Sequence, residues 1–172
     1  MTLVRWIVLL VALERLAELI HGGRNTRRLL AEGARIVGDG HYPLLVAVHA
    51  GWLAALWMFV PRDAEVNIPL LAFFLVLQAA RLWIILSLGP YWTTRIVTLP
   101  GRPLVRRGPY RWVRHPNYLL VSAEIAVLPL AFGAWEIALV FSLLNAAALT
   151  VRIRAEDRAL AGRRGLSPEA DR

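Results

Sequence analysis

The stretch 108–118, Gly-Pro-Tyr-Arg-Trp-Val-Arg-His-Pro-Asn-Tyr, combines the side chains of this 172-residue chain that are best suited to chemistry. Pro116 can begin a helix there, because its missing amide hydrogen would have no partner in a first turn. The free amides that follow Pro116 form a helix end that accepts anions, with His115 and Tyr118 beside it. The stretch therefore predicts a binding site for a charged ligand.

A second group of candidates lies near the end of the chain. Arg152 and Glu156 are four residues apart and share one face of a predicted helix, with Asp157 adjoining. A positive sulfonium or amine could bind Glu156, and an anionic nucleophile could bind Arg152. The alternative is a solvated ion pair between the two side chains, which contributes little.

The absence of cysteine limits the chemistry that remains. It removes disulfides, thiolate metal sites and thiol nucleophiles. His41 and His49 are eight residues apart, and we find no third ligand, so no metal site is predicted. We expect the two histidines to be an interface anchor and a polar contact between helices. The sequence also offers no Ser-His-Asp set.

Long apolar stretches must position these groups, since 58% of the residues are hydrophobic and the mean hydropathy is +0.52. A transmembrane helix needs roughly 17–25 mostly apolar residues. Five candidate stretches are 3–20, 43–60, 68–88, 118–132 and 135–151. Only Gly133 and Ala134 separate the last two, which predicts an antiparallel helical hairpin whose first arm is bent by Pro129.

We therefore predict an all-α, polytopic integral membrane protein with a single membrane domain, 1–172. Its three N-terminal transmembrane helices lie in 1–88, and a long loop, the hairpin and a C-terminal helix lie in 89–172. The loop, 89–117, is rich in proline, glycine, aromatic residues and arginine, which predicts an ordered pocket lip at the membrane surface. The alternative is an interfacial belt that only anchors the helices.

The distribution of charge predicts an orientation. All 20 basic residues are arginines, the net charge is +8, and the arginines concentrate after the first helix, after the third helix and in the tail. Short loops rich in arginine stay cytoplasmic, so we expect the N-terminus outside and the C-terminus in the cytoplasm, in the inner membrane, with the site facing the cytoplasm. Arginines confined to one membrane face also argue against nucleic acid as a partner.

The first helix carries charges inside an apolar stretch. Glu14, Arg15 and Glu18 interrupt it, so we expect a retained helix rather than a signal peptide. Ionisable groups inside a membrane are functional candidates, which makes Glu14 and Glu18 candidates for substrate contact. The alternative is an ion-pair network of Glu14 and Glu18 with Arg15 and Arg81 that holds the first and third helices together.

Two motifs resemble those of one family. Residues 108–118 are similar to the Arg-His-Pro-x-Tyr signature of the isoprenylcysteine carboxyl methyltransferase family, and residues 152–157 resemble its C-terminal Arg-x-x-x-Glu-acidic motif. The resemblance covers roughly 94–160, although phospholipid methyltransferases and some membrane reductases share the first signature. The N-terminal half is similar to a bacterial subgroup, through Glu18, Arg24-Asn25, Gly40-His41-Tyr42-Pro43 and His49.

The resemblance implies S-adenosylmethionine as the cofactor and assigns the residues that bind it. Those residues are Pro103, Leu104, Val105, Tyr110, His115, Pro116, Asn117, Tyr118 and Glu156. It further implies that Arg152 orients the methyl acceptor, and Arg95 aligns with a polar residue of the family upstream of the cofactor segment. The family's run of glutamates is reduced here to Glu156-Asp157.

The implied function is an integral-membrane O-methyltransferase for a lipophilic acceptor. The acceptor is the enol or phenol hydroxyl of a long-chain polyketide, such as an alkylpyrone or alkylresorcinol, or a carboxylate like that of prenylcysteine. An acceptor that is already an anion needs no strong general base. The alternatives are a phospholipid N-methyltransferase, an NADPH-dependent membrane reductase and a scaffold without enzymatic activity. The sequence makes no prediction of an oligomeric state.

Overall fold

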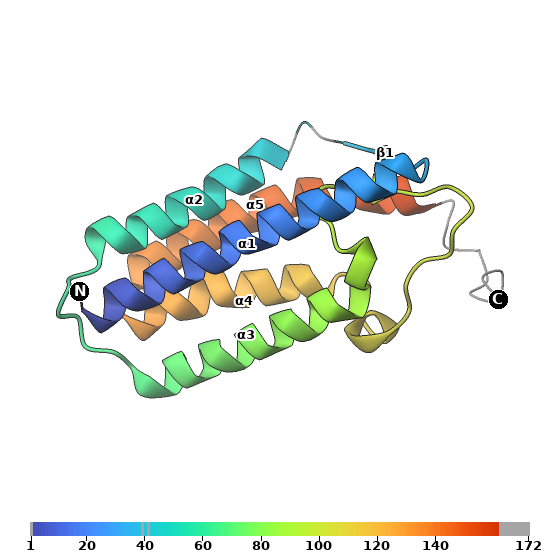
Figure 1. The fold of residues 1–172 in the computed structure, drawn as a ribbon. Helices are drawn as coiled ribbons and strands as arrows, with labels where there is room; N and C mark the ends of the chain where they lie inside the picture. The colour runs from blue at the N-terminus through green and yellow to red at the C-terminus, as the bar shows by residue number, and fades with distance from the viewer. Residues whose placement is uncertain (1, 39, 41, 162–172) are drawn as a thin grey trace.

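The computed structural model describes residues 2–38, 40 and 42–161, and this part of the chain folds into a bundle of five α-helices (Figure 1). The helices are α1 (Leu3–Ala31), α2 (Tyr42–Phe59), α3 (Ile68–Leu88), α4 (Pro116–Ala131) and α5 (Trp135–Leu160). The connections α2–α3 and α4–α5 lie at one end of the bundle, and the long connection from α3 to α4 lies at the other (Figure 1). The all-helical prediction is confirmed.

The helix boundaries follow from local chemistry. α3 begins where the side chain of Asn67 accepts a hydrogen bond from the backbone N–H of Leu70 at 3.0 Å. α4 begins at Pro116, as predicted, and α5 follows it after a turn in which Gly133 has a φ of +71°. This turn forms the predicted hairpin of α4 and α5.

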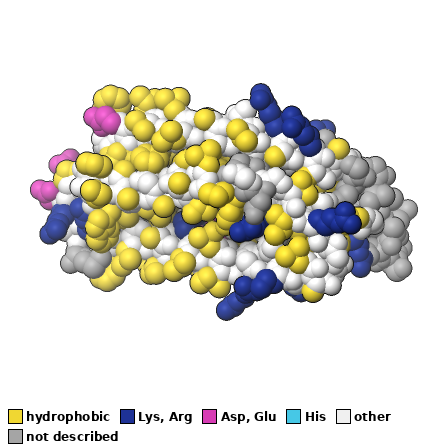
Figure 2. All heavy atoms as spheres, turned by 90° about the horizontal axis from the view of Figure 1, so that it is seen from above, with side chains coloured by type: hydrophobic (Ala, Val, Ile, Leu, Met, Phe, Trp, Pro, Cys, Tyr) yellow, Lys and Arg dark blue, Asp and Glu magenta, His cyan; other side chains and the backbone are white. Residues whose placement is uncertain are grey.

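Within the described residues, three helices are long and apolar enough to cross a membrane: Tyr42–Phe59, Ile68–Tyr91 and Trp135–Leu160. α4 is apolar but shorter, and α1 is long but carries charges at its centre. Hydrophobic side chains cover much of the bundle surface, and arginines gather toward the half that holds the α3–α4 connection (Figure 2). Such an apolar surface suits lipid rather than water, so the chain is a membrane protein.

Two helices continue beyond the predicted apolar stretches, and this matters for the site. α1 runs past residue 20 to Ala31, and α5 runs past residue 151 to Leu160, so the predicted C-terminal helix is a direct continuation of the fifth apolar stretch. Because α5 is continuous, Arg152 and Glu156 belong to the same rigid helix as the apolar span. α1 likewise carries its polar last turns up to the α3–α4 connection.

The connection between α3 and α4 is ordered by contacts with these helix ends. It contains two 3₁₀ turns, Gly89–Tyr91 and Gly108–Arg111, and a strand β2 (Val97–Thr98). β2 pairs antiparallel with β1 (Arg35–Ile36), a pairing that the sequence did not predict. The side chain of Asn25 on α1 donates to the carbonyl of Trp92 at 2.9 Å. The sequence predicted an ordered loop here, and the turns, the strand pairing and this hydrogen bond show that the connection is ordered.

Gly108 shows why the lip needs glycine at one position. Its φ is +56°, and a Cβ at this residue would clash with the hydroxyl of Ser87 and lie 2.8 Å from the Cβ of Ser87. Only a residue without a side chain fits against α3 there. This close approach places the following turn, which carries Tyr110, beside the helix ends.

Candidate functional site

Tyr118, Arg152 and Glu156 form the centre of the site. The Nε atom of Arg152 donates a hydrogen bond to the Tyr118 hydroxyl at 2.7 Å, and that hydroxyl donates to Glu156. Arg152 also donates through Nη2 to the carbonyl of Thr94 at 2.9 Å. Within the described residues Arg152 and Glu156 are joined through the phenol and form no direct ion pair. Both charged groups are therefore held in place rather than solvated together.

His115 extends this centre on the side of the lip. Its Nε2 lies 3.3 Å from a carboxylate oxygen of Asp157, which can only accept, so Nε2 carries a hydrogen. Its ring stacks on that of Tyr118, with centroids 5.3 Å apart and planes 18° apart. The start of α4 and the end of α5 thus meet, as expected from a hairpin that returns to the face it left.

A cavity of about 640 Å³ opens between these residues and the α3–α4 connection. Its volume lies within the range of small-molecule sites, roughly 300–1,000 Å³. Of the residues predicted to bind a cofactor, it is lined by Leu104, Val105, Tyr110, His115, Asn117, Tyr118 and Glu156. Pro103 and Pro116 do not line it; Pro116 is buried in the first turn of α4. Arg95 and Arg152 also line this cavity, which we call the first cavity.

Two polar atoms in the wall of the first cavity lack protein partners. The indole Nε1 of Trp92 and the Oδ1 of Asn117 are buried and make no hydrogen bond within the described part of the chain. A buried polar group without a partner costs free energy, so one donor and one acceptor are available to a ligand. Trp92 was not among the predicted site residues, because an aromatic residue in this loop fitted an interfacial belt equally well.

Tyr110 supplies a further donor to the first cavity. Burial and, to a lesser extent, the carboxylate of Glu156 raise the pKa of the Tyr110 phenol above its ordinary value of 10.0. Its hydroxyl therefore keeps its proton throughout the physiological range. The wall of the cavity thus combines carboxylate, phenol, indole, amide and imidazole groups.

A second cavity, of about 290 Å³, lies within the helix bundle and is mostly apolar. Its apolar lining includes Leu16, Leu19, Leu45, Val46, Leu53 and Val121. Thr93, Asn117, Tyr118 and Arg152 line both cavities, so the two meet at the centre of the site. A polar ligand in the first cavity and an apolar ligand in the second could therefore react across this shared wall.

The charges of α1 belong to a buried network. Arg81 of α3 lies 3.0 Å from Glu18 and forms a bidentate pair with Glu124 of α4, and Arg15 lies 3.3 Å from Glu18. The alternative reading of these charges as an ion-pair network of the first and third helices is therefore confirmed. Glu18 also lines the second cavity, whereas Glu14 pairs with Arg15 and lines neither cavity.

The remaining candidates are placed as follows. The Arg95 guanidinium lies 4.9 Å from the centroid of the Tyr42 ring, at the edge of the first cavity. His49 lines the second cavity, and His41 lies outside the described residues. Among the residues that the structure describes, no group of three His, Asp or Glu side chains could hold a metal ion.

Comparison with known proteins connects this site to a family. Residues 70–162 match the sequence model of the isoprenylcysteine carboxyl methyltransferase family. YpbQ, an uncharacterized protein of Bacillus subtilis, is 36% identical over 160 residues, which cover 90% of this chain and 95% of the relative. An uncharacterized protein of Haemophilus influenzae is 28% identical over 145 residues, which cover 80% of this chain and 83% of that protein. No solved structure matches the chain.

Proposed function

Because the chain belongs to the isoprenylcysteine carboxyl methyltransferase family, we propose that it is an integral-membrane, S-adenosylmethionine-dependent methyltransferase that methylates an oxygen of a lipophilic acceptor. One observation carries the proposal: two cavities of unlike chemistry meet at Arg152 and Tyr118. The first combines charged and polar groups with apolar side chains and is large enough for a nucleoside cofactor, and the second is mostly apolar and lies within the bundle.

The first cavity fits the cofactor by the chemistry of its wall. S-adenosylmethionine supplies, when bound, a methyl group on a positively charged sulfur. Glu156 would balance that charge, and the unpartnered atoms of Trp92 and Asn117 would bind polar atoms of the base or the amino acid part. Arg111 and Arg114, which also line the first cavity, would attract the carboxylate.

Arg152 would orient the acceptor oxygen from the shared wall. Its Nε and Nη2 atoms are used by Tyr118 and Thr94, while Nη1 has no hydrogen-bond partner within the described residues. The Nη1 hydrogens can therefore bind an acceptor oxygen, and the other two bonds hold the guanidinium still. Positioning of this kind, together with an apolar cavity that excludes water, is the main contribution that a protein makes to a displacement reaction.

The acceptor that we propose is a long-chain polyketide with an enol or phenol hydroxyl, or a carboxylate like that of prenylcysteine. The resemblance of the N-terminal half to a bacterial subgroup of the family motivates the first choice. The apolar second cavity supports an acceptor with a long tail. The same site then has two entrances, one for a polar cofactor and one for a lipid.

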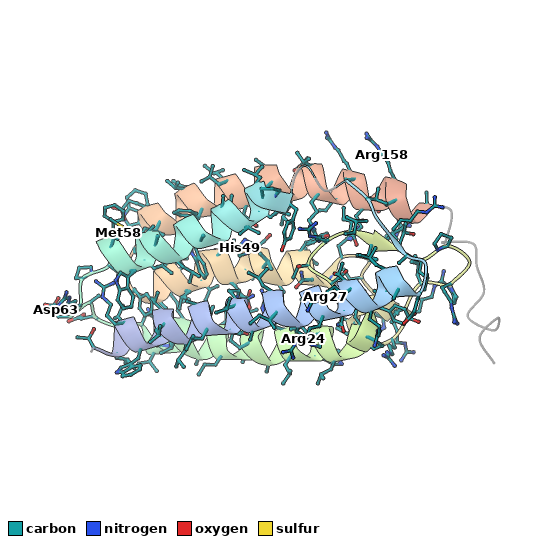
Figure 3. The ribbon with its side chains drawn as sticks, turned by 45° about the horizontal axis from the view of Figure 1, so that its top comes forward. Arg24, Arg27, His49, Met58, Asp63 and Arg158 are labelled. Carbon is teal, nitrogen blue, oxygen red and sulfur yellow. The ribbon has the colours of Figure 1, made fainter. Side chains whose placement is uncertain are left out.

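We further propose that 1–172 is a single membrane domain in which all five helices cross the inner membrane, with the N-terminus outside and the first cavity toward the cytoplasm. Arg24, Arg27 and Arg158 lie in the half of the bundle away from Asp63, in line with the rule that positive residues stay inside (Figure 3). A reporter fused to the C-terminus should be active only in the cytoplasm. A periplasmic signal would overturn this orientation.

Calorimetric titration of the purified protein in detergent with S-adenosylhomocysteine tests the cofactor assignment. We expect saturable binding of S-adenosylhomocysteine. Because its sulfur is neutral, the effect of Glu156→Gln is measured with S-adenosylmethionine, whose sulfonium Glu156 would balance. That affinity should fall about 10-fold or more, since a close charge pair contributes at least roughly 1.5 kcal/mol. Glu136→Gln is the matched control, since Glu136 is an exposed carboxylate in the first turn of the same helix. Absence of saturable binding to the unmodified protein would refute the proposal.

The class of acceptor is tested with membranes that contain the protein and labelled S-adenosylmethionine. The expected result is a label on a long-chain hydroxyl compound or carboxylate, identified by mass spectrometry. A label on ethanolamine lipids would instead identify a phospholipid N-methyltransferase. Saturable binding of NADPH in place of S-adenosylhomocysteine would identify a reductase, and binding of neither would identify a scaffold.

A further inference from the structure

His49 is a polar residue of α2 that lines the second cavity among mostly apolar side chains. Figure 3 shows it on the side of α2 that faces the other helices, away from both ends of α2. Leu45, one turn before it on the same face, packs with Leu149 and Tyr118 near the shared wall. His49 therefore faces the same space as Tyr118 and Arg152, at a deeper level of the bundle.

The hydrogen bonding of His49 determines what its ring offers to the cavity. Nδ1 lies 2.8 Å from the carbonyl oxygen of Leu45. A carbonyl can only accept, so Nδ1 carries a hydrogen. An uncompensated charge is costly among mostly apolar side chains, so the ring is neutral and Nε2 is left with a lone pair. No described residue donates a hydrogen bond to Nε2. The second cavity thus presents a hydrogen-bond acceptor that only a donor on a ligand can satisfy.

The other walls of the second cavity limit where an apolar tail can lie. Arg15, Glu18 and Arg81 form its charged side, which an alkyl chain would avoid. Leu16, Leu19, Val46 and Ala50 line it as well, and they are exposed on the outer surface of α1 and α2. A tail would leave between α1 and α2 along these residues, while the polar head group stays inside.

We propose that Nε2 of His49 accepts a hydrogen bond from a hydroxyl of the methyl acceptor, a second hydroxyl besides the oxygen that lies against Arg152. This inference rests on the proposed function and names the head group that the site prefers. A compact ring with two hydroxyls satisfies both Arg152 and His49, whereas a monocarboxylate leaves the His49 lone pair without a donor. His49 is then a residue that determines specificity and takes no part in the transfer itself.

The test compares two probes that differ by one hydroxyl, a resorcinol and a phenol, each with the same pentadecyl chain. Binding to the protein loaded with S-adenosylhomocysteine is followed by tryptophan fluorescence, and kcat/KM is measured with S-adenosylmethionine. We expect the resorcinol to be preferred about 3- to 10-fold in both measurements, which is the contribution of one neutral hydrogen bond. In His49→Phe the preference should vanish in binding and in kcat/KM. Only a statistical factor of about two should remain, because the resorcinol has two equivalent hydroxyls and the phenol has one.

Two further variants separate the role of His49 from a structural one. His49→Gln places an amide oxygen in the cavity and should restore part of the preference for the resorcinol. Ala47→Leu is the matched control, because Ala47 lies on the exposed face of α2 at the same depth, and it should keep the full preference. All variants should bind S-adenosylhomocysteine with unchanged affinity, which also shows that they fold.

The inference is overturned by an unmodified protein that binds both probes equally, by one that binds neither, or by a His49→Phe variant that keeps the full preference. In those cases cofactor binding and methylation of another acceptor leave the proposed function standing. A protein that does not bind S-adenosylhomocysteine refutes the proposed function instead. The two failures are therefore distinguishable in the same set of titrations.

Discussion

Replacement of Tyr118 by Phe removes one oxygen from the centre of the site and leaves the rest of the side chain. That hydroxyl accepts a hydrogen bond from Arg152 at 2.7 Å and donates one to Glu156. Both partners are charged, and each such bond contributes roughly 1.5–3 kcal/mol. The ring keeps its stacking on His115, with centroids 5.3 Å apart, so we expect Tyr118→Phe to fold.

The expected loss is smaller than the sum of the two bonds. Arg152 keeps its bond to the carbonyl of Thr94 at 2.9 Å, so its guanidinium stays in place without the phenol. We therefore expect Tyr118→Phe to cost about as much as one hydrogen bond to a charged group, which is about 10- to 100-fold in kcat/KM. Initial rates of methyl transfer, together with calorimetric titration of S-adenosylhomocysteine, divide this loss between the cofactor and the acceptor.

Tyr42→Phe is the matched control for this substitution. Its hydroxyl also lies beside the site but bonds only a neutral group, the hydroxyl of Thr94, at 3.2 Å. Loss of a neutral hydrogen bond corresponds to about 3- to 10-fold at most. Equal effects of Tyr42→Phe and Tyr118→Phe, or a Tyr118→Phe enzyme within about twofold of the unmodified one, would refute the assignment of Tyr118 as the link between the two charges.

Three other predictions concern stability and pH. Gly108→Ala should lower the thermal unfolding temperature in detergent, because its Cβ meets Ser87 at a positive φ, and Ser87→Gly should restore part of the loss. Glu124→Gln should destabilise by up to about 3–5 kcal/mol, because it removes one of the two carboxylates that pair with the buried Arg81 guanidinium and leaves only Glu18; an unchanged midpoint of unfolding would contradict this. Burial raises the pKa of Tyr110 above 10.0, so as the pH rises the unfolded state loses this proton before the folded state does. The free energy of unfolding should therefore fall as the pH rises past about 10. Thermal midpoints measured over a series of pH values should fall less steeply in Tyr110→Phe.

Much of the site could be predicted from the sequence because the positions of its residues follow from their near neighbours in the chain. Pro116 can begin a helix because of its own missing N–H, and Arg152 and Glu156 share a helical face at a spacing of four. The short turn at Gly133 then requires the two helices to return to the same end. These three rules bring His115 and Tyr118 to the end of α5 without any knowledge of the remaining helices.

The rest of the site depends on contacts between distant segments. Glu124 looks like an isolated acidic residue in an apolar helix, and its partner Arg81 lies 43 positions earlier on α3. Trp92 is distinguished from other interfacial aromatic residues only by its buried, unpartnered N–H. The pairing of β1 with β2 joins the segment after α1 to the lip through two residues on each side, too few for a recognisable strand pattern.

The buried charges and the entrance of the second cavity belong to one structural arrangement. Helices in lipid gain no hydrophobic driving force from each other, so polar contacts and close packing decide which helices are held together. The network of Arg15, Glu18, Arg81 and Glu124 holds α1 against α3 and α4. On its other side, beside α2, the cavity is lined mainly by Leu, Val and Ala side chains, which an alkyl chain can displace at little cost. Because α1 is fixed on the side of the charges, we propose that the seam between α1 and α2 is the side of the bundle that would admit the proposed lipophilic acceptor.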